Sequence, residues 1–137
     1  MDTIDYRYAV VVDDTRDVGE VVRDWLIDSQ YRVRLFSEPL KALEFLRSGE
    51  AATVGVVLSD LQMPRMEGTE FLRNTAEILP GTVRVLMSAK DGVVPLMDGR
   101  IIHMVVRKPF EFQEFLRSVQ QKVDELRVLH IQESVGL

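Results

Sequence analysis

The chain has 137 residues, a hydrophobic fraction of 46% and a net charge of −5, which suit one globular domain with one core. It contains no cysteine, so disulfides, a thiol nucleophile and a thiolate metal site are excluded, and a reducing compartment, the cytoplasm, is expected. The acidic balance does not favour nucleic-acid binding. The first residues lack the features of a signal peptide, and no apolar stretch is long enough for a membrane span, so a membrane is not an expected partner.

Apolar runs alternate with helical patterns along the chain, which predicts an α/β fold. Strands are expected at 8–13, 32–36, 54–59, 82–88 and 101–106,. Helices are expected at 17–29, after Ser37, around 71–79 and from Glu111 onwards,. A further helix at 89–100 would be short or irregular, because glycine and proline interrupt this segment,. The alternation predicts a three-layer sandwich in which five helices surround a five-stranded parallel sheet.

Five polar residues follow the predicted strands at their carboxyl ends. They are Asp13, Asp14, Asp60, Ser88 and Lys108. Functional groups gather at the carboxyl ends of parallel strands, so we expect three carboxylates, a hydroxyl and an ammonium group to converge in one pocket. Such a set can bind a divalent cation and a phosphoryl group.

The acidic residues of this set predict a metal site. Asp13 and Asp14 at one strand end, with Asp60 at another, supply the oxygen ligands that Mg²⁺ prefers,. Without metal the carboxylates repel one another, and at least one pKa should rise. Taken alone, the Asp13-Asp14 pair could equally cap the following helix. The third carboxylate favours the metal site.

Asp60 is also a candidate nucleophile, because a carboxylate can attack phosphorus and form an acyl phosphate. The cation and Lys108 would neutralise the crowded negative charge, and Ser88 could donate a hydrogen bond to a phosphoryl oxygen. The alternative for Asp60 is a turn residue, since the segment after it, 61–68, is turn-like. Serine and lysine are common on any surface, so only the positions of Ser88 and Lys108 after separate strands support this interpretation.

These motifs make the chain resemble the receiver domains of response regulators in two-component signalling. The matching segments are Val10–Asp14, Leu58–Pro64 with Gly68, Met87–Ala89 and Lys108–Phe110. The match extends over roughly residues 7–125. The resemblance implies a flavodoxin-like sheet with strand order 2-1-3-4-5, a receiver domain at 1–125, and a helical extension or the start of a linker at 126–137.

The resemblance also implies the ligands of the metal. Asp60 would be the phosphoacceptor and a ligand of Mg²⁺. Asp14 would bind Mg²⁺ directly and Asp13 through water, and the backbone carbonyl of Gln62 would complete the protein ligands.

The phosphoryl group would be held by Ser88, by Lys108 and by the backbone N–H of Ala89. The donor would be a histidine kinase, a phosphotransfer protein or a small phosphodonor. The chain would thus act as a switch in a phosphorelay, and it would catalyse at most its own phosphorylation and dephosphorylation.

The residues that would pass the effect of phosphorylation to the protein surface differ from the family pattern. Val105 stands three positions before the lysine, where the family usually has an aromatic switch residue. The last predicted helix carries a coiled-coil type of apolar seam, formed by Phe112, Leu116, Val119, Val123 and Leu126,. We expect the far end of this helix to project beyond the domain, where it could pair with a second copy to give a homodimer or join a following module. The alternative is that its apolar face only covers the sheet, which is the expected role of Phe112 through Val119.

Two other functions fit these residues less well than a phosphorylation switch. A receiver-like scaffold that works without phosphorylation would not need all five polar residues. A phosphohydrolase with an aspartyl nucleophile on the first strand would need a carboxylate two residues after it as general acid, and Thr15 occupies that position.

Overall fold

The computed structural model describes residues 3–89, 98–108 and 111–134 of the chain. In chain order these residues form the strand β1 (Asp5–Val12), the helix α1 (Arg16–Asp28), β2 (Arg32–Phe36), α2 (Pro39–Leu46), the 3-10 helix η1 (Gly49–Ala51), β3 (Val54–Asp60), α3 (Gly68–Ile78), β4 (Val83–Ser88), β5 (Met104–Arg107) and α4 (Phe112–Ser134).

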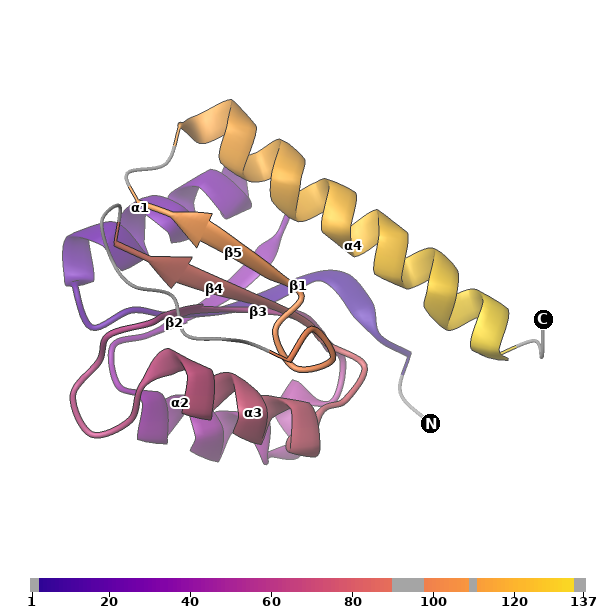
Figure 1. Ribbon diagram of the computed structural model, residues 1–137, viewed down its shortest axis with the longest axis horizontal. Coiled ribbons are helices and arrows are strands. Elements are labelled where there is room, and N and C mark those ends of the chain that lie inside the picture. The colour runs from indigo at the N-terminus through magenta and orange to yellow at the C-terminus, as the bar shows by residue number, and fades with distance from the viewer. Residues whose placement is uncertain (1–2, 90–97, 109–110, 135–137) are drawn as a thin grey trace.

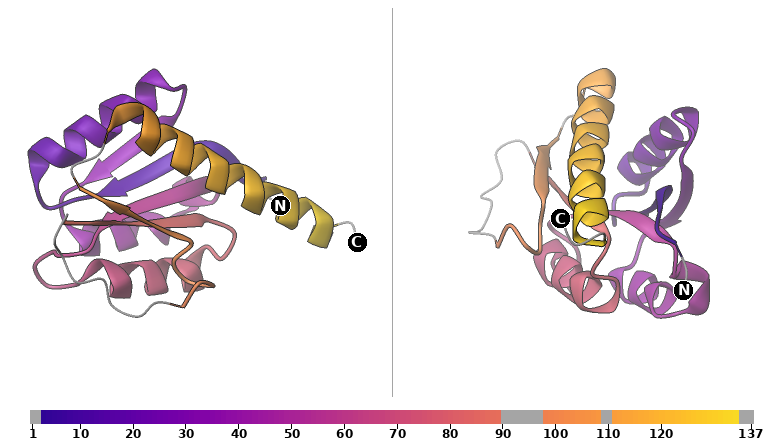
Figure 2. Two further views of the ribbon diagram at one scale, coloured as in Figure 1. Left: turned by 45° about the horizontal axis from the view of Figure 1, so that its top comes forward. Right: turned by 90° about the vertical axis from the view of Figure 1, so that its right-hand side faces the viewer.

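The strands form one parallel sheet in the order β2-β1-β3-β4-β5, as the resemblance implied (Figure 1). Helices α2 and α3 cover one face of the sheet, and α1 and α4 cover the other (Figure 2). Central strand β3 is buried at every position, whereas the arginines of edge strand β2 are exposed. The predicted three-layer sandwich is therefore confirmed.

The described part of the chain contains four of the five expected helices. The short helix expected at 89–100 falls mainly on residues 90–97, which lie outside the described residues, and residues 98–103 contain a turn and no helix. Pro109 and Phe110 of the matching motif also lie outside them.

Two strands begin three residues away from their predicted starts. β1 begins at Asp5 instead of residue 8, because the backbone N–H of Asp5 donates to the carbonyl of Thr53 and extends the pairing with β3. β5 is limited to Met104–Arg107, because the carbonyl of Asp98 accepts from the N–H groups of Ile101 and Ile102 and closes a turn there. Strand β5 is thus a short edge strand.

The last helix, α4, runs for 23 residues to Ser134. Phe115, Val119 and Val123 of this helix are buried against the sheet. Phe112, the first residue of the predicted seam, is 37% exposed and lies against the ring of Trp25 in α1. The final turns extend past the sheet (Figure 1). None of the described helices is both long and apolar enough to cross a membrane.

Candidate functional site

The carboxyl ends of four strands bring the predicted polar residues together. Asp13 and Asp14 directly follow β1, Asp60 ends β3, Ser88 ends β4 and Lys108 directly follows β5. The parallel register aligns these ends, since Val12 pairs with Ser59, Asp60 with Met87 and Ser88 with Arg107. The apolar runs that predict the strands therefore also place the site.

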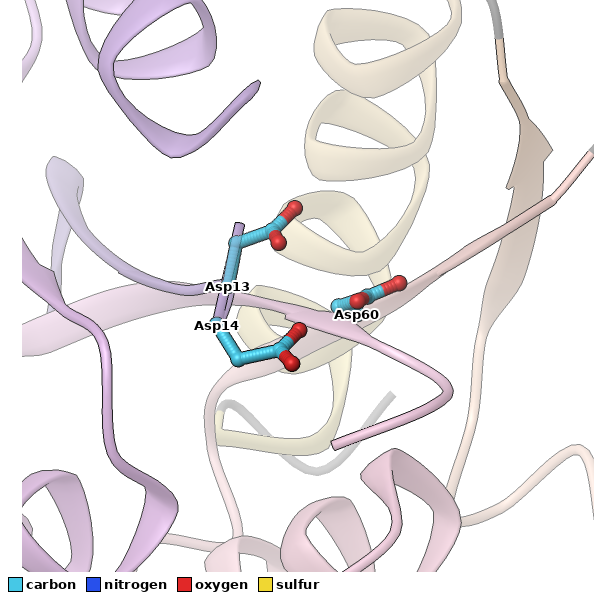
Figure 3. Close-up of side chains that lie close together, drawn as sticks. All are labelled: Asp13, Asp14 and Asp60. Carbon is cyan, nitrogen blue, oxygen red and sulfur yellow. The ribbon is translucent and has the colours of Figure 1, made fainter. Parts of the chain in front are cut away.

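The three carboxylate side chains lie close together (Figure 3). One oxygen from each of Asp13, Asp14 and Asp60 lies within 4.8 Å of the others. Asp13 and Asp60 are buried and Asp14 is exposed. Three carboxylate oxygens at this separation, open to water on the Asp14 side, fit a hard divalent cation such as Mg²⁺, which takes oxygen ligands and retains waters.

Asp13 also has a structural role. Its Oδ1 accepts a hydrogen bond of 2.9 Å from the backbone N–H of Thr15, the residue that precedes α1. The side chain of Thr15 itself makes no capping bond. This bond orders the turn ahead of α1 and does not reach the amides of the first helical turn, so it is not a helix cap,. The other oxygen, Oδ2, accepts from Lys108 in the site.

Lys108 joins two of the carboxylates. Its Nζ lies 3.1 Å from Asp13 Oδ2 and 3.0 Å from Asp60 Oδ1. Burial disfavours the charged form of Lys108, but the hydrogen bond to Asp60 and the charge of Asp13 outweigh it, so the pKa of Lys108 is raised,. The ammonium group is therefore permanently charged at neutral pH.

Asp60 has an environment that opposes its negative charge. The pKa of Asp60 is raised from 3.8 to about 6. Burial is the largest cause and Asp13 and Asp14 also raise the pKa, while Lys108 lowers it,. The expected rise in at least one carboxyl pKa is thus found at Asp60. A cation bound by the three carboxylates would remove most of this conflict.

Ser88, Ala89 and Gln62 line a pocket of about 240 Å³ together with Asp60. Asp14, Lys108, Thr15 and Leu61 complete its lining. The hydroxyl of Ser88 is buried and donates only a long bond of 3.3 Å to the Ala89 carbonyl. It can therefore turn to a phosphoryl oxygen in the pocket at small cost.

The backbone around Asp60 is fixed by the start of α3. The N–H of Gly68 donates to the carbonyl of Leu61 at 2.7 Å, and the N–H of Leu61 donates to the carbonyl of Met87 at 2.8 Å. A Cβ atom at position 68 would collide with the backbone oxygen of Asp60. Only glycine lets α3 approach the acceptor strand this closely.

One structurally important residue was missed by the sequence analysis. Arg84, in the middle of β4, is only 3% exposed and uses its guanidinium to bind several backbone carbonyls. Its signal in the sequence is a charged residue inside an otherwise apolar strand, Val83–Met87.

Comparison with known proteins places this geometry in a family. The family model described as the response regulator receiver domain matches residues 9–120. The response regulator MprA of Mycobacterium ulcerans is 33% identical over 112 residues, which are 78% of this chain and 46% of MprA. The transcriptional regulatory protein DltR of Streptococcus agalactiae is 26% identical over 113 residues, 81% of this chain and 49% of DltR. The chain spans about half the length of these curated relatives.

Solved structures share the fold. The signal receiver domain of an HD domain-containing protein from Pseudomonas fluorescens Pf-5 superimposes with a TM-score of 0.77 at 23% identity, covering 88% of this chain and 97% of that one. The beryllofluoride-activated NtrC4 receiver domain dimer superimposes with a TM-score of 0.74 at 20% identity, covering 88% of this chain and 98% of that one.

Proposed function

This chain belongs to the response regulator receiver domain family, and from that premise we propose that it is a signalling switch that accepts a phosphoryl group on Asp60. The observation that supports this most strongly is the position of Lys108, whose Nζ bridges Asp13 and Asp60 across 3.1 and 3.0 Å. A lysine held in this way beside a buried carboxylate can stabilise charge that develops when the carboxylate attacks a phosphoryl group.

The proposed transfer assigns a task to each residue. An oxygen of Asp60 forms a bond to the phosphorus, and the bond from phosphorus to the donor atom breaks, with its electron pair leaving on the donor. Lys108 exchanges its contact with Asp60 for a phosphoryl oxygen, and the hydroxyl of Ser88 and the N–H of Ala89 donate to the phosphoryl oxygens. The product is an aspartyl phosphate, which water later hydrolyses.

The metal proposed for this step is Mg²⁺. Asp13, Asp14 and Asp60, with the backbone carbonyl of Gln62, would hold it, and when bound it supplies positive charge against the phosphoryl oxygens. The oxygen-only donor set within 4.8 Å supports this choice,.

The proposed donor is a histidine kinase, a phosphotransfer protein or a small phosphodonor such as acetyl phosphate. The chain promotes its own phosphorylation and dephosphorylation and has no other proposed catalytic activity. The relatives named above are a transcriptional regulatory protein, DltR, and a response regulator, MprA, and a cytoplasmic regulator is the proposed setting of this chain. No site for nucleic acid is proposed within this chain.

Labelling with acetyl phosphate tests the proposal. In the presence of Mg²⁺ the parent should gain the mass of one phosphoryl group, and Asp60→Asn should gain none. Asp60→Glu is the matched charged control and should also stay unlabelled if geometry at the acceptor matters. A parent that gains no mass with Mg²⁺ and donor would leave the scaffold function as the better account.

The C-terminal helix supports a second, separate proposal about domain limits. We propose a receiver domain at 1–125 and, at 126–137, a C-terminal helical extension or the start of a linker. Among the α4 side chains whose burial is described, up to residue 132, Val123 is the last buried one, and Leu126 is half-buried. Beyond them, Val128, Leu129 and Ile131 are each about half exposed, at 52–53%.

The extension is proposed to bind a second copy of the chain. The next position of the sheet-facing seam after Leu126 is His130, which is exposed, so the apolar residues beyond Leu126 lie on other faces of the helix,. Val128 and Ile131 are three residues apart and share one of these faces. The NtrC4 receiver domain, whose fold is similar, is described as a dimer.

Light scattering with and without beryllofluoride tests self-association. A Val128→Glu/Ile131→Glu variant should remain monomeric where the parent dimerises, and Arg127→Glu is the control for added negative charge on the same turn. Monomers of the parent under every condition would exclude the dimer and leave the extension as a linker.

A further inference from the structure

We infer that Arg84 and His103 form a clasp that sets the register of β5, and that Arg84 is therefore a positioning residue for Lys108. The clasp lies at the amino end of the β4–β5 pair, at the opposite end of the strands from the site. The inference deepens the proposed function and rests on it for its catalytic consequence.

The hydrophobic pattern of β5 does not specify its register. Met104 and Val106 pack on the face covered by α1 and α4, and Val105 packs on the opposite face. All three are apolar and half-buried. A slip by one residue would exchange the two faces without exposing or burying a polar group there, so the cost would be small.

A slip would, however, displace Lys108. One residue of strand advances the backbone by about 3.3 Å. The Nζ of Lys108 contacts Asp13 and Asp60 at 3.1 and 3.0 Å, and its backbone N–H donates to the carbonyl of Ser88 at 2.7 Å. These contacts depend on the pairing of Ser88 with Arg107. The site therefore needs a register that the apolar residues alone do not provide.

Arg84 joins the two segments that lead into β4 and β5. Its Nε donates to the carbonyl of Ile101 at 2.6 Å, and one terminal nitrogen donates to the carbonyl of Arg100 at 3.0 Å. The other terminal nitrogen donates to the carbonyl and hydroxyl of Thr82, at 2.9 and 2.8 Å, and to the carbonyl of Pro80 at 3.3 Å. The acceptors described for this buried cation are all neutral oxygens.

His103 fixes the same position from the backbone. Its N–H donates to the carbonyl of Arg84, and its Nδ1 accepts from the N–H of Arg84, both at 2.9 Å. A slip of β5 would break this exchange and move the carbonyls of Arg100 and Ile101 away from the guanidinium. Buried donors without acceptors are costly, so the native register is the one in which the clasp can close.

Two pairs of variants test the clasp. Arg84→Lys keeps the charge but cannot reach both segments, and Arg32→Met on the opposite edge strand is an arginine control. His103→Leu removes the Nδ1 acceptor. His103→Asn places its Oδ1 acceptor the same number of bonds from the Cα atom as Nδ1, so this variant should keep the register of the parent.

The first measurement is the strand register, read from cross-strand NMR contacts between Val85 and Met104 and between Ser88 and Arg107. Arg84→Lys and His103→Leu should weaken these contacts and accelerate exchange of the Lys108 amide proton. His103→Asn and Arg32→Met should not. Retention of all these contacts in both Arg84→Lys and His103→Leu would overturn the clasp, whatever the outcome of labelling.

The second measurement separates positioning of Lys108 from general loosening of the fold. Arg84→Lys should slow labelling by acetyl phosphate by about 10- to 100-fold, the scale expected for a misplaced catalytic group. Its Mg²⁺ affinity, measured by calorimetry, should not weaken, because the carboxylates lie on β1 and β3. A parallel loss of labelling and Mg²⁺ affinity would contradict a role through Lys108. An unlabelled parent would instead refute the proposed function, and the register measurement would still decide the clasp.

Discussion

Asp60 is a buried carboxylate whose surroundings oppose its charge, and this property predicts a dependence of stability on pH. The folded pKa is raised from 3.8 to about 6. Between those values the folded chain binds more protons than the unfolded chain, so the free energy of unfolding falls as the pH rises through this window. In metal-free buffer above pH 6, the ionised carboxylate therefore destabilises the fold.

Asp60→Asn should consequently unfold at a higher temperature than the parent in metal-free buffer at about pH 7.5. The expected gain is of the order of 2 kcal/mol, reduced by loss of the contact with Lys108. The gain should shrink below about pH 5, where the parent carboxyl is protonated. Asp17→Asn on the exposed start of α1 is the control, and an equal gain in that variant would contradict a site-specific effect.

The lowered pKa of His103 predicts the opposite dependence of stability on pH. Burial, and then the charges of Arg84 and Lys122, lower its pKa from 6.5 to about 4. Between these values the unfolded chain binds a proton that the folded chain does not, so the free energy of unfolding falls as the pH decreases from about 6.5 towards 4. The contribution lost is of the order of 2–3 kcal/mol.

His103→Asn isolates this contribution, because asparagine retains an acceptor but does not titrate. Urea denaturation at about pH 7 and pH 4.5 should show a smaller loss of stability in His103→Asn than in the parent. Identical losses in the two proteins would show that other groups cause the acid sensitivity.

At the scale of the elements, β3 and α3 lie too close together at Gly68 to leave room for a side chain there. A methyl group at position 68 would collide with the carbonyl oxygen of Asp60, whereas Gly49 has open space around its Cα. Gly68→Ala should therefore cost about 1–3 kcal/mol of stability, as overpacking does, and should slow labelling of Asp60. Gly49→Ala should do neither, and chemical denaturation with labelling kinetics measures both. Parent-like stability and labelling in Gly68→Ala would contradict this packing.

The elements also show what sequence patterns can and cannot predict. The apolar runs placed β3 and β4, and the polar residues at strand ends placed the site, because a parallel sheet aligns those ends. The start of β5 was predicted three residues early, since Ile101 and Ile102 look like strand residues but are held in a turn by Asp98. The clasp of Arg84 depends on carbonyl groups from other segments, which no local pattern reveals.

For the whole molecule, folding and metal binding should be linked, because only the folded chain brings Asp13, Asp14 and Asp60 within 4.8 Å. At a Mg²⁺ concentration about 100 times the dissociation constant, binding should add about 2.7 kcal/mol to the free energy of unfolding. Asp14→Ala should lose most of this increase, while Asp124→Ala on α4 should retain it. A parent melting temperature unaffected by Mg²⁺ would contradict the metal site.

Asp60 is the proposed phosphoacceptor of the whole molecule, and chemical trapping tests this assignment directly. Borohydride reduces an aspartyl phosphate to homoserine, which can be located by peptide mass spectrometry after labelling with acetyl phosphate and Mg²⁺. We predict homoserine at position 60 and nowhere else in the chain. Homoserine at Asp13 or Asp14, or a phosphoryl group retained on a histidine with Asp60 unmodified, would contradict the account.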